Sequence, residues 1–351
     1  MENRHISKLV TELNLKAPQI AAVEKLLAEG STVPFIARYR KEATGSLDEV
    51  AVTVIRDRLA QLEQLEKRRI AILESLNKNG YLTDELNAEI QAAETLSVLE
   101  DLYLPFRPKR RTRATKAREK GLEPLAQLIF EQEGNNPLKE ATAYLDAEKG
   151  VETIDAALDG ARDIMAEWIN EDGDARAGMR RLFFEKGMLK SSVATGMEAA
   201  GAKYKDYFDW QEPVSKAPSH RILAMLRGEK EDMLNLLIAP AEEDALALLR
   251  NRFVMGENAD SEQVVMAIED SYKRLLSRSM ETETRLAAKE RADEAAIKVF
   301  ADNLQQLLLA SPLGAMRVMG IDPGFRTGCK VVCLDGEGNL HHHDTIYPHG
   351  G

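Results

Sequence analysis

The sequence predicts a mainly α-helical chain that ends in three short β-strands. Apolar residues recur at helical spacing through most of the first 310 positions. Aromatic residues make up only 5% of the chain, and Gly and Pro number 22 and 12, which is little for an all-β protein with many turns. From Arg317 onward the helical spacing gives way to short apolar runs separated by turn residues.

Charge is unevenly distributed along the 351 residues. Lys and Arg total 47 and Asp and Glu total 58, which gives a net charge of −11. Between Arg107 and Lys120, however, eight Lys or Arg accompany one Glu. An acidic surface argues against a protein that coats nucleic acid with its whole exterior, but a local basic segment still neutralises phosphates. The length alone indicates roughly two or three domains.

The first helices are expected to be short, and a long one follows them. A helix over 17–28 ends at Gly30, and a turn then leads into a short helix before Lys41. Ser46 and Glu49 have the spacing of a capping box, which predicts a helix of about thirty residues that begins there and ends at Gly80. Its apolar positions include Val50, Val54, Leu59, Leu62, Leu65, Ile72, Leu73 and Leu76.

Helices continue through the middle of the chain. Thr83 and Ser97 are N-cap candidates, and Pro124 suits a first helical position. Apolar residues at helical spacing predict further helices, which are expected over 153–170, 262–278 and 281–309. No repeat of fixed period is present in the sequence, so a regular solenoid is not predicted.

Membrane insertion and export are not expected. The longest uncharged stretch near the end, Asn303–Met316, is shorter than the roughly 18–20 residues that cross a bilayer. The N-terminus lacks the apolar core of a signal peptide. Cys329 and Cys333 are expected on one strand, too far apart for a disulfide. Free thiols and these absences predict a cytoplasmic location.

Three strands are predicted after the last helix, over 317–321, 329–334 and 340–346. Asp322-Pro323-Gly324 is expected to form a turn, and Asp335–Asn339 a hairpin loop. Three strands without covering helices do not make an independent α/β domain. We therefore expect that the sequence is a fragment, cut near the start of a further domain.

The basic segment carries the strongest chemical signal. Tyr103 and Phe106 precede it and are candidates for stacking on a base. Its cations suit phosphate binding, although the same pattern fits a solvated connector or one that packs on acidic parts of the chain. The candidate nucleic-acid-binding residues are Arg107, Lys109, Arg110, Arg111, Arg113, Lys116 and Arg118.

A shorter basic run, Arg38-Tyr39-Arg40-Lys41, is a second candidate. Its cations, Arg38, Arg40 and Lys41, can reach a backbone phosphate. A solvated helix end has the same composition, so both interpretations stay open at this point.

Asp322 is a weak candidate metal ligand. In polynucleotidyl transferases of the ribonuclease H type, an Asp at the end of the first strand helps to bind two Mg²⁺ ions. A single carboxylate is not a site for a hard cation, and Asp322 also suits a turn. His341–His343 alternate between the two faces of a strand, so they cannot converge on one ion. No metal site, cofactor or catalytic residue is therefore predicted.

Several segments, in this order, resemble the bacterial Tex family of transcription accessory proteins. They are TVPFIARYRKE at Thr32–Glu42, LEDLYLPFRPKRRTR at Leu99–Arg113, GLEPLA at Gly121–Ala126, DYFD at Asp206–Asp209, PSHR at Pro218–Arg221 and MGIDPGFRTG at Met319–Gly328. Together they span essentially the whole chain.

The resemblance implies an N-terminal helix-turn-helix region, a long helical scaffold and a ribonuclease-H-like domain of the YqgF type. Helix-hairpin-helix elements and an S1 RNA-binding domain would follow, and Tex-like proteins bind RNA mainly through S1. On this basis the chain would hold a helix-turn-helix-like region with the long helix over 1–80, a central scaffold over 81–316, and an incomplete YqgF-like domain over 317–351. The S1 domain would be absent.

Three functions are compatible with these features. The leading one is a non-enzymatic transcription accessory factor that contacts RNA or DNA and positions further domains. The second is the N-terminal part of a metal-dependent ribonuclease-H-like nuclease that uses Asp322. The third is a scaffold that binds RNA polymerase or other transcription proteins, with nucleic acid contacted elsewhere.

Overall fold

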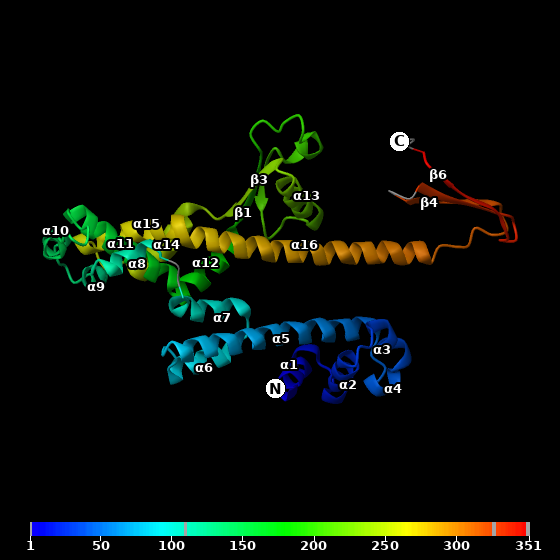
Figure 1. Cartoon of the computed structure of the whole chain (residues 1–351), viewed down its shortest axis with the longest axis horizontal. Coiled ribbons are helices and arrows are strands. Elements are labelled where there is room, and N and C mark those ends of the chain that lie inside the picture. Colours follow the sequence, from blue (N-terminus) through cyan, green and yellow to red (C-terminus); the bar gives the residue numbers. More distant parts are fainter. Residues whose placement is uncertain (1, 109–110, 325–327, 349–351) are drawn as a thin grey trace. The chain divides into compact units, whose positions relative to one another are not determined.

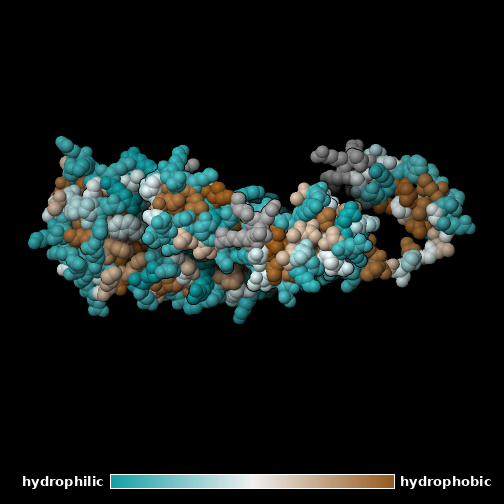
Figure 2. Space-filling view, turned by 90° about the horizontal axis from the view of Figure 1, so that it is seen from below, coloured by the Kyte–Doolittle hydropathy of each residue, from teal (hydrophilic) through white to brown (hydrophobic). Residues whose placement is uncertain are grey.

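The computed structural model describes residues 2–108, 111–324 and 328–348. Helices account for most of the chain, and three strands close its described part (Figure 1). This confirms the mainly α-helical fold class with a three-stranded C-terminal piece. On the face drawn in Figure 2, hydrophilic residues surround smaller hydrophobic patches, as expected for a chain that is 30% charged.

The chain divides into two compact units. The first runs to Ala217 and includes Met225–Ala288, and the second consists of Pro218–Ala224 with the chain from Lys289 onward. Helices α13 (Ser219–Lys230) and α16 (Ser277–Leu308) each belong partly to both units.

The N-terminal part of the first unit packs short helices on one long helix. These elements are α1 (Glu2–Leu13), α2 (Ala17–Ala28), α3 (Val33–Tyr39), α4 (Lys41–Thr44) and α5 (Glu49–Lys78). Their buried core comprises Leu9, Ile20, Val23, Val33, Ile36, Leu47, Val52, Ile55, Leu59 and Leu62. As expected, Gly30 and Gly80 follow α2 and α5 with positive φ angles of 84° and 74°.

The predicted capping box at Ser46 is wrong. Asp48 caps α5, and its carboxylate accepts a hydrogen bond from the Ala51 amide at 2.8 Å. Ser46 instead has a left-handed φ of 63°. Leu47, between Ser46 and Asp48, is buried in the core. Because the apolar Leu47 side chain is buried in the core, helix α5 begins after Asp48 and not after Ser46.

The buried face of α5 differs from the predicted one only in its first turns. Val50 and Val54 are 70% and 42% exposed, whereas Val52 and Ile55 are fully buried. Further along, the predicted positions are correct for Leu59, Leu62, Leu65, Ile72 and Leu76.

Two helices extend this packing along α5: α6 (Asp84–Ala92) and α7 (Leu96–Tyr103). Thr83 caps α6 as predicted. The cap of α7 is Thr95, which accepts from the Val98 amide at 3.3 Å, and not Ser97.

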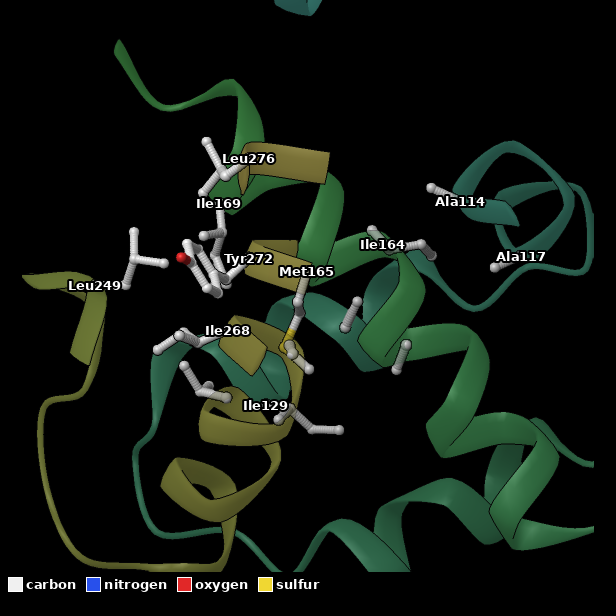
Figure 3. Close-up of a cluster of buried hydrophobic side chains, with 14 of the residues drawn as sticks. Ala114, Ala117, Ile129, Ile164, Met165, Ile169, Leu249, Ile268, Tyr272 and Leu276 are labelled. Atoms are coloured by element: carbon white, nitrogen blue, oxygen red, sulfur yellow. The ribbon is translucent and has the colours of Figure 1, made fainter. Parts of the chain in front are cut away.

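The central core of the first unit is built by helices that lie between residues 113 and 288. They are α8 (Arg113–Glu119), α9 (Glu123–Glu131), α10 (Pro137–Ala141), α11 (Ile154–Glu171), α12 (Gly173–Lys186), α14 (Glu242–Phe253) and α15 (Ala259–Ser271), with the start of α16. Their side chains converge in one apolar cluster (Figure 3). Pro124 lies in the first turn of α9, and Thr153 caps α11, as expected.

A three-stranded antiparallel sheet inside the first unit contradicts the prediction of uninterrupted helix. Its strands are β1 (Met188–Val193), β2 (Asp209–Pro213) and β3 (Leu234–Ala239), in the order β2-β1-β3. Strand β2 is largely polar, β1 is half polar, and β3 is a short apolar run that could equally be part of a helix, so hydrophobic periodicity does not reveal the sheet.

Helix α16 protects the free edge of β3. The Glu281 carboxylate accepts from the Ile238 amide at 3.2 Å, and the Arg285 guanidinium donates to the Leu236 carbonyl at 3.0 Å. Side chains one turn apart on α16 thus satisfy edge groups that would otherwise be open to pairing with another strand.

The helices predicted over 262–278 and 281–309 are joined into one helical run. A π-helical turn, Tyr272–Leu276, links α15 to α16. No Gly or Pro lies between Arg278 and Glu281, so nothing interrupts the backbone hydrogen bonds there.

A buried ionic network connects α7, α12 and α16. The Arg176 guanidinium donates to the Asp101 carboxylate at 2.6 Å and to Glu283 at 3.0 Å. Arg180 donates to the same two carboxylates, at 2.8 and 2.7 Å. Since Asp101 and Arg176 are almost completely buried, each charge depends on its partners.

The second unit contains the end of α16 and a second antiparallel sheet, β4 (Val318–Gly324), β5 (Gly328–Leu334) and β6 (Leu340–Ile346). The predicted strands are therefore confirmed. The turn predicted at Asp322-Pro323-Gly324 is wrong, because these residues belong to β4 and pair with β5. The hairpin loop after Leu334 is confirmed: the Asp335 carboxylate accepts from the Glu337 and Asn339 amides, both at 2.9 Å.

Both cysteines are free thiols, as expected. Apolar residues of the last helix, α16, are exposed, among them Leu286, Ile297, Leu304 and Leu308. In the part of the chain that the structure describes, no helix has the length and apolar character needed to cross a membrane.

Candidate nucleic-acid interface

The basic segment forms a short helix whose position is set by a cap and two alanines. The Thr112 hydroxyl accepts from the Thr115 amide at 3.0 Å and starts α8. Ala114 and Ala117 are buried and face Ile164 of α11 (Figure 3). Because small side chains allow close approach, α8 lies directly along α11.

One arginine of α8 is held by carboxylates. Arg118 donates to Glu167 of α11 at 2.5 Å and to Glu123 at 2.9 Å. Glu167 is only 6% exposed and also accepts from the Thr112 hydroxyl at 3.2 Å. Burial lowers the pKa of the Arg118 guanidinium, but the hydrogen bonds to the two glutamates outweigh it, and the pKa is raised. Arg118 is thus held in place by Glu167 and Glu123 while remaining partly exposed.

A second carboxylate of α11, Asp163, lies one turn before Glu167. It is 4.0 Å from Arg113 and 3.4 Å from Arg274, which comes from the π-helical turn. Burial raises the pKa of Asp163, against the lowering effects of Arg274 and Arg113. Asp163 and Glu167 form an acidic stripe on α11. Glu167 pairs with Arg118, whereas Arg113 is exposed and lies 4.0 Å from Asp163.

Three other cations of the segment are exposed, whereas Lys120 donates to the Gly150 carbonyl at 2.7 Å. Arg107 and Lys116 are exposed and make no salt bridge to any described residue. Arg111 is exposed and pairs with Glu119 at 2.8 Å, a solvated contact that contributes little. We call Arg107, Arg111 and Lys116 the outer cations. Lys109 and Arg110 lie outside the described residues.

The aromatic residues before the segment do not form the expected stacking site. Tyr103 is buried, and its hydroxyl hydrogen bonds with Ser75 at 2.8 Å. Phe106 packs against Tyr81, with ring centroids 5.7 Å apart. The stacking prediction is therefore wrong for Tyr103, because an internal polar partner accounts for its hydroxyl.

The second basic run is exposed throughout. Arg38, Arg40 and Lys41 lie at the junction of α3 and α4. Arg38 is 3.9 Å from Glu49, and the Arg40 guanidinium lies 4.8 Å above the Phe35 ring. These cations are not brought into contact with α8 by any described interaction.

Asp322 is exposed on β4, opposite Lys330 of β5. The three histidines, 341–343, are exposed on β6. Within the described ranges, no group of three His, Cys, Asp or Glu side chains is placed to hold a metal ion.

Charge counting alone did not identify the acidic stripe. Asp163 and Glu167 are separated from α8 by more than forty residues. The i, i+4 spacing of the two carboxylates on a predicted helix was the available signal, but it does not reveal which helix they face.

Comparison with known proteins decides the family. Three family models match in order along the chain: the Tex-like protein N-terminal domain over 3–77, the Tex central region-like model over 132–300, and the Tex protein YqgF-like domain over 316–351. The chain belongs to the Tex family. The resemblance inferred from the sequence is thereby confirmed.

Individual Tex relatives match over nearly the whole chain. Protein YhgF of Escherichia coli is 44% identical over 97% of this chain and 45% of its own length. Protein tex of Bordetella pertussis is 43% identical over 98% of this chain and 45% of its own. The human S1 RNA-binding domain-containing protein 1 is 27% identical over 99% of this chain and 36% of its own. The chain thus spans less than half the length of these relatives.

Proposed function

We propose that this Tex-family chain contacts nucleic acid through the outer cations, Arg107, Arg111 and Lys116, and acts as a helical scaffold. The observation that carries the proposal is the division of the basic segment. Arg118 is paired with Glu167 of α11, whereas the outer cations are exposed. Exposed cations on a rigid helix and its preceding loop bind phosphates and release counterions.

The names of the relatives support this choice. One relative, of Neisseria gonorrhoeae, is called transcriptional accessory protein Tex, and the human relative is named for an S1 RNA-binding domain. We extend this to a role beside the transcription machinery, in which the scaffold holds domains relative to RNA or DNA and performs no chemistry.

Retention of RNA polymerase on the immobilised chain after nuclease treatment tests a direct contact between the chain and the polymerase. Loss of the polymerase on that treatment contradicts it.

A salt titration tests the nucleic-acid contact. Fluorescence anisotropy of a labelled single-stranded RNA gives the affinity of the chain between 50 and 200 mM salt. Replacing the three outer cations with Gln is expected to weaken binding and to reduce the slope of log K against log salt by about 2, since each phosphate contact contributes roughly 0.7.

The matched control removes the same charge elsewhere. Lys25, Lys67 and Lys78 are exposed on α2 and α5, and their replacement with Gln is expected to leave the slope nearly unchanged. Equal effects of the two triple variants would mean that only the net charge matters.

A separate experiment tests the alternative of a metal-dependent nuclease. RNA recovered after incubation of the chain with Mg²⁺ is expected to be intact. Cleavage that is abolished by Asp322→Asn would favour the nuclease function instead.

A further inference from the structure

Helix α3 separates its residues into two faces. Val33, Ile36 and Ala37 are buried against the N-terminal core. Phe35 and Tyr39, one turn apart, occupy the opposite face, because residues at i and i+4 lie on the same side of a helix. They are 37% and 67% exposed. The fold therefore uses one side of α3 and leaves two aromatic rings on the other.

The two rings form a pair on the surface. Their centroids are 5.5 Å apart and their planes are inclined at 45°. Rings placed this way attract each other, yet Tyr39 still presents most of its surface to solvent. The pair therefore offers an exposed aromatic surface at the end of α3, which we call the platform.

Cations surround this platform. The Arg40 guanidinium lies 4.8 Å above the Phe35 ring, and its Nη1 donates to the Tyr39 carbonyl at 3.1 Å. The exposed Arg38 approaches Glu49 only at 3.9 Å, and Lys41 follows at the start of α4. Three cations therefore accompany the two rings, with Glu42 and Glu49 as the acidic residues beside them. We call Phe35, Arg38, Tyr39, Arg40 and Lys41 the α3 surface.

We propose that the α3 surface binds single-stranded nucleic acid, with an unpaired base stacked on Tyr39 and the cations on the adjacent phosphates. The inference rests on the proposed nucleic-acid role and specifies its substrate as an unpaired strand. Aromatic rings that accompany basic side chains are the combination that holds single strands, because every base has a face that can stack. A duplex keeps its bases inside and offers only phosphates.

The Tyr39 ring provides the test, because its removal changes no charge. Affinities of the chain for a labelled twelve-nucleotide oligo-U and for a duplex of equal length are measured by anisotropy. Tyr39→Ala is expected to weaken single-strand binding about tenfold, to leave the salt slope unchanged, and to leave duplex affinity within about twofold. Tyr39→Phe, which keeps the ring, is expected to bind like the unaltered chain.

Phe300 supplies a matched control. It is 67% exposed, as Tyr39 is, and lies on α16, so Phe300→Ala removes a comparably exposed ring from another helix and is expected to have no effect on binding. Thermal unfolding of both variants checks that the fold is retained, as expected for exposed side chains.

The outcomes separate this inference from the function on which it rests. If Tyr39→Ala keeps full single-strand affinity while the outer-cation variant loses it, the α3 inference is overturned and the α8 interface stands. If Tyr39→Ala weakens binding and the outer-cation variant does not, the α3 surface stands alone. No measurable binding by the unaltered chain overturns both. Unchanged RNA affinity with loss of retained RNA polymerase would assign the rings to a protein partner instead.

Discussion

Helices α3 and α8 each have seven residues, and each begins after a threonine N-cap. Both carry cations, but the neighbours of these cations differ. Helix α8 lies along α11, whose Glu167 pairs with Arg118 and whose Asp163 lies 4.0 Å from the exposed Arg113. Helix α3 packs an apolar face on its core and meets no comparable carboxylate stripe among the described residues, so its cations lie beside exposed rings.

The comparison shows that the cations of a basic segment can either stabilise the fold or remain available for binding. A cation beside a buried carboxylate becomes part of the fold, because separating the pair leaves a buried charge. A cation in solvent contributes little to stability and remains available to a polyanion. Within α8 both kinds occur two residues apart, at Lys116 and Arg118.

The largest expected effect separates these two residues. Arg118→Ala is expected to lower the free energy of unfolding by about 2–3 kcal/mol, because the buried Glu167 loses its ion pair with Arg118. Lys116→Ala is expected to stay within about 0.5 kcal/mol. Urea denaturation of both variants measures the difference, and equal losses would show that the α11 stripe does not stabilise α8.

The sequence predicted the basic segment and helix α11, but it did not predict that the two are neighbours in the fold. Charge density identified Arg107–Lys120, and helical spacing identified α11 with its cap at Thr153. That α8 lies on α11 depends on tertiary packing of Ala114 and Ala117, which local patterns do not encode. Local sequence patterns therefore do not predict that Arg118 is paired with α11 while Lys116 is exposed.

The errors in the fold have similar causes. Ser46 and Asp48 both suit an N-cap, and the burial of Leu47 decides between them. Strand β1 contains Lys190, Ser191 and Ser192 in six residues, so its apolar pattern is weak. Its stability comes from β2 and β3, which are distant in the sequence.

A smaller effect is expected at the two threonine caps. Thr112→Ala removes a cap bond of 3.0 Å and a donor to Glu167, whereas Thr32→Ala removes only a cap bond of 3.4 Å. We expect losses of about 1–2 kcal/mol for Thr112→Ala and below about 1 kcal/mol for Thr32→Ala.

Serine at each position keeps the hydroxyl and is the control. Thermal or urea unfolding of the four variants ranks the caps. A larger loss at Thr32 than at Thr112 would mean that the bond to Glu167 adds nothing to the α8 cap.

The smallest effect is expected at Asp163, and its sign is opposite. Since burial raises the pKa of Asp163 above its ordinary value, the folded state binds this proton more tightly than the unfolded chain does. The ionised carboxylate therefore costs stability at neutral pH, and this cost disappears as the pH falls through the raised pKa. Asp163→Asn is expected to leave stability at pH 7 unchanged or slightly higher, by less than about 1 kcal/mol.

The pH dependence distinguishes this from an ordinary surface substitution. The difference in unfolding free energy between Asp163→Asn and the unaltered chain should be most favourable to the variant at neutral pH and should shrink toward acid pH. A variant that is clearly less stable at pH 7 would mean that attraction to Arg113 and Arg274 exceeds the burial cost. In that case Asp163 would stabilise α8 by charge, as Glu167 does, and the two carboxylates of the stripe would act alike.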